Sequence, residues 1–124
     1  MAFRVEVSPR AFDDLDAIAG YIADHGNFER AQEWFNGMIG AIASLKDMPG
    51  RCPVADESKE LGREVRFLLH GGRSRMYKVY SSIHAEAQAA GTVQVLHVRH
   101  WARRALTAEE LEQLMDETDP ERER

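Results

Sequence analysis

Hydrophobic and polar positions alternate with two different periods along the chain. Residues 3–7 alternate apolar and charged side chains, which is typical of a half-buried strand. From Ser8 and Pro9 onward the apolar residues repeat with a helical period. Ser is a favoured N-cap, and Pro fits the first helical position because its missing N–H is not needed there. This helix is predicted to end near residue 24, and a second helix with a broad apolar face is predicted over residues 28–46.

Three strand segments are predicted in the second half of the chain. Residues 49–62 contain prolines and glycines without a clean period and predict a loop. The segments 63–69, 74–83 and 92–100 are rich in Val, Tyr, Ile and Leu, and a polar turn at residues 84–90 separates the last two. The order predicts an α+β fold, in which an N-terminal strand precedes a helical hairpin. The hairpin packs on one face of a mostly antiparallel sheet that contains the three later strands.

The C-terminal part is predicted to form a short helix. Thr107 and Glu110 have the spacing of a capping box, and a narrow apolar stripe follows them. Residues 118–124 are too charged to fold alone and are predicted to be a frayed acidic tail. The chain of 124 residues is therefore interpreted as a single domain over residues 1–117.

Composition excludes several classes of protein. Cys52 is the single cysteine, so an internal disulfide framework and a zinc ribbon are excluded. The chain has no apolar run long enough for a membrane span and no signal-peptide pattern at its start, so a cytoplasmic location is expected. The motifs of phosphate loops and zinc proteases are absent from the sequence, and no cofactor or metal site is predicted.

Charge is distributed unevenly along the chain. The net charge is −5, which argues against specific DNA binding by the chain alone. Residues 63–104, however, carry 8 basic and only 2 acidic side chains, between two acidic flanks. If the odd-numbered strand residues pack on the helices, Arg66 and Lys78 project together from the uncovered face of the sheet, with Arg75 nearby. Such a face suits anion recognition, and the alternative is a solvated face with a few surface ion pairs.

The sequence resembles the RelE/ParE superfamily, the toxins of type II toxin–antitoxin systems. The resemblance spans residues 3–104 and rests on the order and spacing of several short segments. They are the strand-to-helix start Val5–Leu15, the strand Tyr77-Lys78-Val79-Tyr80, and the run from Val95 to Arg103.

The ParE-like branch is favoured, because His100 and Arg103 are similar to the His-x-x-Arg strand end of that branch. The resemblance implies a toxin that stops growth by binding DNA gyrase and is neutralised by a cognate antitoxin. The residues proposed to bind the target or antitoxin are Arg66, Arg75, Lys78, His100 and Arg103.

Two alternatives stay open within the superfamily. A RelE-like toxin would cut messenger RNA on the ribosome, with Arg66, Lys78 and Arg103 as its catalytic candidates. An inactive relative would only bind the antitoxin. In each case an acidic antitoxin segment is expected to approach the basic part of the chain, which the acidic residues 109–123 are expected to shield in the free toxin.

Overall fold

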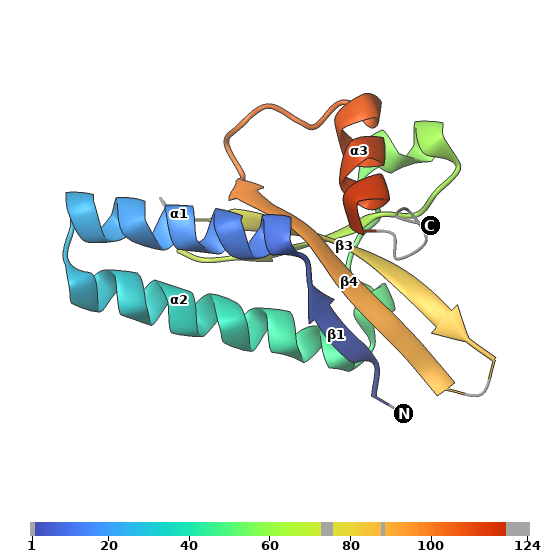
Figure 1. Cartoon of the computed structure of the whole chain (residues 1–124), viewed down its shortest axis with the longest axis horizontal. Helices are drawn as coiled ribbons and strands as arrows, with labels where there is room; N and C mark the ends of the chain where they lie inside the picture. Colours follow the sequence, from blue (N-terminus) through green and yellow to red (C-terminus); the bar gives the residue numbers. More distant parts are fainter. Residues whose placement is uncertain (1, 73–75, 88, 119–124) are drawn as a thin grey trace.

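The helical hairpin begins where its sequence signals predict. The computed structural model describes residues 2–72, 76–87 and 89–118. Helix α1 (Pro9–His25) is capped by the Ser8 hydroxyl, which accepts a hydrogen bond from the Ala11 N–H at 3.0 Å. Helix α2 (Phe28–Ala43) is capped in the same way by Asn27. A short connection joins the two helices, which lie antiparallel and side by side (Figure 1).

The helix predicted over residues 28–46 is slightly too long, because a 3₁₀ turn replaces its last three residues, Ser44–Lys46. The loop predicted over residues 49–62 contains two further 3₁₀ turns, Pro49–Arg51 and Asp56–Leu61. Within the described residues, no helix has both the length and the apolar character needed to cross a membrane.

The sheet is mixed and has the strand order β1-β4-β3-β2. Strand β3 (Tyr77–Glu86) pairs antiparallel with both β2 (Arg66–His70) and β4 (Ala89–His100), as predicted. The N-terminal strand β1 (Arg4–Val7) joins this sheet at its other edge, parallel to β4. The polar turn expected at residues 84–90 is shorter than predicted, since β3 and β4 continue through most of it as a hairpin.

Both faces of the sheet are covered. Helices α1 and α2 pack on one face, where Leu15 and Met38 share the larger core with Val95. Helix α3 (Ala108–Thr118) packs on the other face, where Leu111 shares a second core with Tyr80 (Figure 1). The prediction that one face stays uncovered is therefore wrong. The C-terminal helix buries an apolar row of its own, which requires an apolar sheet surface opposite it.

Helix α3 begins with the predicted capping box. The Thr107 hydroxyl accepts from the Glu110 N–H at 3.1 Å, and the Glu110 carboxylate accepts from the Thr107 N–H at 3.0 Å. Because α3 is packed into a core, Glu109 and the helical residues after it do not form a loose tail. Of the predicted tail 118–124, Thr118 ends α3, and residues 119–124 lie outside the described residues.

Candidate functional site

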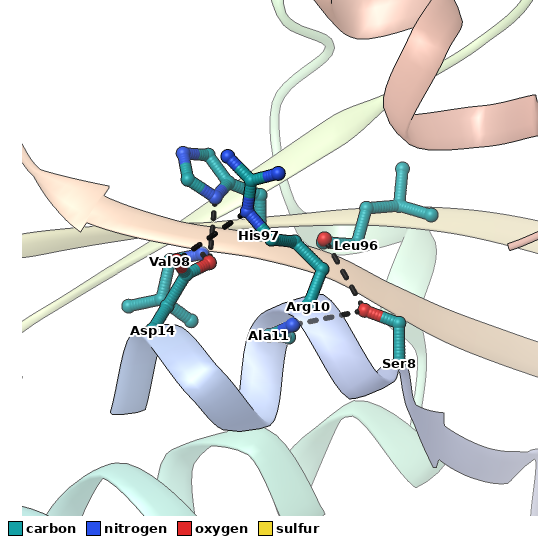
Figure 2. Close-up of polar contacts among 7 residues, drawn as sticks. All are labelled: Ser8, Arg10, Ala11, Asp14, Leu96, His97 and Val98. Carbon is teal, nitrogen blue, oxygen red and sulfur yellow. Dashed lines mark hydrogen bonds and ion pairs between the residues drawn. The ribbon is translucent and has the colours of Figure 1, made fainter. Parts of the chain in front are cut away.

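The end of β4 extends beyond the strand that flanks it. Strand β1 pairs with β4 only from Thr92 to Val95, so the later residues of β4 have α1 instead of a strand on this side. Ser8, between β1 and α1, contacts β4 at the point where the pairing with β1 ends. Its backbone N–H donates to the Val95 carbonyl at 3.0 Å. Its hydroxyl donates to the Leu96 carbonyl at 3.3 Å (Figure 2). The start of α1 is thereby attached to the open edge of β4.

Asp14 makes the second attachment of α1 to β4. Its Oδ2 accepts a hydrogen bond from the Val98 N–H at 3.0 Å and lies 2.6 Å from Nδ1 of His97 (Figure 2). Because an ionised carboxylate only accepts, Nδ1 is the ring nitrogen that carries the proton. The Arg10 guanidinium lies 3.7 Å from the other oxygen. Asp14 is therefore fully occupied with holding α1 in place.

Beyond Asp14 the C-terminal half of α1 and the ends of β3 and β4 enclose a groove of about 580 Å³. Its α1 wall is largely apolar and aromatic, and Tyr21 stacks on His25 with ring centroids 4.0 Å apart. Its opposite wall carries basic side chains. The α1/β4 groove is defined by Ile18, Tyr21, Tyr77, His100 and Arg103.

Arg99 lies beside the groove, on the opposite face of the sheet from Tyr77 and His100. Only 6% of its surface is exposed, and its buried Nε makes no hydrogen bond within the described residues. Burial lowers the pKa of the Arg99 guanidinium, and the nearby charges of Arg103 and Arg104 lower it further. Lys78 is its direct neighbour on β3, so both cations lie on the sheet face that α3 covers, where the carboxylate of Glu110 is also near Arg99. Like charges at such positions repel, and the nearby carboxylate of Glu110 offsets part of this repulsion.

Comparison with known proteins identifies the family. The family model described as "ParE toxin of type II toxin-antitoxin system, parDE" matches residues 5–105. The chain belongs to the ParE toxin family. The predicted resemblance to the ParE-like branch is confirmed, and with it the class of type II toxins.

A solved structure supports the same conclusion for the fold. A chain described as "Chromosomal ParDE TA system from P. aeruginosa" superposes with a TM-score of 0.62 at 16% sequence identity. The match covers 80% of this chain and 96% of that one. No curated protein sequence matches this ParE-family chain.

Helix α3 lies after the region that the ParE family model matches, which ends at residue 105. In this family member, Arg104 and Glu110 fix the start of α3 through two hydrogen bonds of 2.6 and 3.1 Å. The helix then covers Tyr80, which is 1% exposed and whose hydroxyl has no hydrogen-bond partner within the described residues. Burial raises the pKa of the Tyr80 phenol, and the carboxylate of Glu57 adds to this effect.

The predicted binding residues of this ParE-family toxin are not all in one place. His100 and Arg103 line the α1/β4 groove. Lys78 lies on the sheet face that α3 shares, with its Nζ 5.2 Å from the centroid of the Phe67 ring. Arg75 lies outside the described residues.

Arg66 lies on the opposite face of the sheet from Lys78, so the prediction that they project together is wrong. In the strand register Arg66 pairs with Ser81, whereas Lys78 pairs with Leu69. The odd-numbered residues of β2 face α3 and not the helical hairpin, which places Arg66 on the hairpin side.

Arg66 holds the loop that precedes β2. Its guanidinium donates to the carbonyls of Gly50 at 3.1 Å and Cys52 at 2.5 Å, and it forms an ion pair with Glu64. These contacts use both terminal nitrogens of Arg66 within the fold, whereas its buried Nε makes no hydrogen bond within the described residues. Across the described ranges, no three His, Cys, Asp or Glu side chains are grouped in a way that would hold a metal ion.

Proposed function

We propose that this ParE-family chain is a toxin that acts by binding, with DNA gyrase as its target and a cognate antitoxin as its neutraliser. Membership of a family of type II toxins supports the antitoxin as partner. A cytoplasmic location is part of the proposal, since gyrase and nascent antitoxin are found there. The mode of action, by binding and not by cutting RNA, is supported by the arrangement of the sheet.

The main support for the proposal is that α3 covers the face of the sheet opposite the helical hairpin, where a phosphate site had been expected. Cleavage of RNA through its 2′-hydroxyl needs cations on the phosphate and a nearby base and acid. Arg66 and Lys78 point to opposite faces, and Arg66 is used to hold a loop. A shared phosphate site built from these two residues is therefore not available.

The groups with acid–base chemistry near the remaining cations are also poorly placed for catalysis. His97 is 7% exposed and bonded to Asp14, and Tyr80 is 1% exposed beneath α3. A general acid or base must reach the proton that it transfers. The α1/β4 groove, in contrast, offers an apolar wall beside His100 and Arg103, which is typical of a protein-binding surface.

Inducible expression of the chain, with and without the small gene that adjoins its own, tests this proposal. We expect growth arrest with induction of the DNA-damage response, and rescue when both genes are expressed. Purified toxin is expected to inhibit supercoiling by gyrase in vitro. Replication and translation should be followed separately by labelled thymidine and methionine.

The other outcomes identify the alternatives. Immediate arrest of translation with messenger cleavage, and intact gyrase activity, would refute a gyrase toxin and favour a ribosome-dependent nuclease. No growth defect from a chain that accumulates in folded form would show an inactive relative. In a nuclease, Arg66→Gln, Lys78→Gln and Arg103→Gln would each abolish messenger cleavage.

A further inference from the structure

Four side chains form a block on the sheet face that α3 shares. In the register of β3 and β4, Lys78 lies opposite Arg99, and Tyr80 lies opposite His97. Residues two apart on a strand share a face, so all four side chains leave the sheet on the same side. Tyr80 and Arg99 are diagonal neighbours, and the charge of each affects the pKa of the other. Lys78, Tyr80 and Arg99 are called the Arg99 cluster below.

Two polar groups of the Arg99 cluster are buried without a partner. Arg99 is 6% exposed, and its Nε makes no hydrogen bond within the described residues. Tyr80 is 1% exposed, and its hydroxyl also has no partner in residues 2–72, 76–87 and 89–118. Burial of a hydrogen-bonding group without a partner is costly, and burial of a charged group is more so. Both groups are donors, so each of them lacks an acceptor.

Glu110, the carboxylate near Arg99, does not supply this acceptor. Its two oxygens accept hydrogen bonds from the Arg104 guanidinium at 2.6 and 3.1 Å, and one of them also accepts from the Thr107 N–H. Glu110 therefore acts on Arg99 only through its charge. The charge of Arg103 acts on Arg99 in the opposite direction, since it disfavours a second cation nearby.

Lys78 and Glu57 complete the charged surroundings of the Arg99 cluster. The Nζ of Lys78 lies 5.2 Å from the centroid of the Phe67 ring. Glu57 raises the pKa of the Tyr80 phenol through its charge, although the phenol has no hydrogen bond within the part of the chain that the structure describes. Four cations thus act on this place against two carboxylates, and the two unpartnered donors lie in an excess of positive charge.

A small oxyanion fits these donors best. Inorganic phosphate presents several oxygens and accepts hydrogen bonds from a guanidinium and a phenol at the same time. Arginine is the preferred partner of phosphate in proteins. A nucleic-acid strand carries many charges along an extended backbone, whereas Tyr80 is covered by α3 and Arg99 is almost fully buried near the start of that helix. The burial therefore favours a free ion over a polynucleotide.

We propose that the Arg99 cluster binds one inorganic phosphate ion, which accepts hydrogen bonds from the Arg99 guanidinium and the Tyr80 hydroxyl and is balanced by the Lys78 ammonium. The bound ion links β3 to β4 at the start of α3, so it stabilises the covered form of the sheet. The proposal does not depend on the target of the toxin. It places anion recognition on this face at Arg99 and Tyr80, and Arg66 has no part in it.

Thermal unfolding of the full chain in phosphate and in chloride tests the proposal. Protein purified without phosphate is compared in phosphate and in chloride at equal ionic strength and neutral pH. In about 10 mM phosphate we expect the melting temperature to be about 5 °C higher than in chloride, which corresponds to a dissociation constant of about 1 mM. The increase should saturate at higher phosphate concentrations, as binding at one site requires, whereas a general effect of the salt would keep growing.

Two variants separate the site from a general effect of phosphate. Arg99→Met is expected to abolish the increase, and Tyr80→Phe, which removes one atom, is expected to reduce it by about half. In chloride both variants should be at least as stable as the wild type, because they remove a buried donor that has no partner. Arg30→Gln removes an exposed charge from α2 and should respond to phosphate as the wild type does.

Several results would overturn the proposal. One is a wild-type melting temperature that is the same in phosphate and in chloride, and another is a full increase in Arg99→Met or in Tyr80→Phe. If Arg99→Met does not fold, Tyr80→Phe decides. A loss of stability of Tyr80→Phe in chloride would show that the hydroxyl is already satisfied without an anion. Adenosine monophosphate should not stabilise the chain, and stabilisation as strong as that by phosphate would refute a free ion as the ligand.

Discussion

Replacement of Asp14 by Ala tests how the start of α1 is fixed to β4. The carboxylate accepts two hydrogen bonds, from the Val98 N–H at 3.0 Å and from His97 at 2.6 Å, and its side chain is 17% exposed. Loss of a charged acceptor leaves both donors without a partner in a largely buried place. Each such loss costs about 1.5 kcal/mol or more, so we expect the free energy of unfolding to fall by about 3 kcal/mol.

Chemical and thermal unfolding, followed by far-UV circular dichroism, measure this change. For a domain of this size we expect the melting temperature to fall by about 10 °C. Asp13→Ala is the matched control, since Asp13 is the exposed neighbour on the same turn of α1. Asp13 lies after the first turn of α1, so its removal loses only an exposed charge, for which we expect a change of about 0.5 kcal/mol or less.

A double-mutant cycle with His97→Gln separates the bond to the ring from the bond to the backbone. We expect a coupling of about 1 kcal/mol or more between Asp14 and His97, and a remaining effect of Asp14→Ala in the His97→Gln background from the unpaired Val98 N–H. Equal stabilities of Asp14→Ala and Asp13→Ala would refute the view that Asp14 anchors α1.

Two further predictions concern the β3–β4 hairpin and the start of α3. Gly91 has a φ of 108°, and a Cβ there would lie 2.1 Å from the His84 carbonyl oxygen, so Gly91→Ala should destabilise the fold by about 3 kcal/mol in urea unfolding. Gly20→Ala, with open space on α1, should instead stabilise it by about 0.5 kcal/mol; the same sign for both would contradict this reasoning. The Arg104 guanidinium, with the Thr107 N–H, lowers the pKa of Glu110 to about 2, so the stability that its carboxylate contributes is complete above pH 4.5 and is lost as pH falls through about 2. Glu110→Gln should therefore be less stable than wild type at neutral pH and equally stable near pH 2; a gap that persists in acid would disprove this.

The local signals in the sequence predicted the helix starts well. Ser8 and Thr107 each bind a backbone N–H three residues further along, so cap and partner are adjacent in the sequence. The end of β4 at His100 was also predicted correctly, and this places His100 and Arg103 in the groove. Contacts within one turn of a helix need no knowledge of the rest of the fold.

The face of β2 could not be predicted in the same way. Phe67 packs towards α3 and Leu68 towards the helical hairpin, so apolar residues occur on both faces of this strand. Alternation identifies a strand, but it does not identify the face that meets a given helix when both faces are buried. The position of Arg66 was wrong for this reason.

The sequence could not predict that the residues of the α1/β4 groove lie together. Its α1 wall includes Tyr21, and its opposite wall includes His100, far later in the chain. Arg99 was one of several basic residues of the middle segment, and nothing in its place on β4 indicated that it would be buried. Only the three-dimensional arrangement distinguishes it from its neighbours.

The parallel pairing of β1 with β4 has a consequence for the synthesis of the toxin. Strand β1 can pair with β4 only after residues 92–95 have been translated. The hydrogen bonds of Ser8 and Asp14 to β4 need residues 95–98. Contacts between such distant parts of a chain form late in folding. A nascent or truncated chain that stops before β4 has neither edge strand nor anchored helix, and it also lacks the basic wall of the groove. The anchored toxin fold therefore forms only after residues 92–98 have been translated, so shorter nascent chains are not yet the folded toxin.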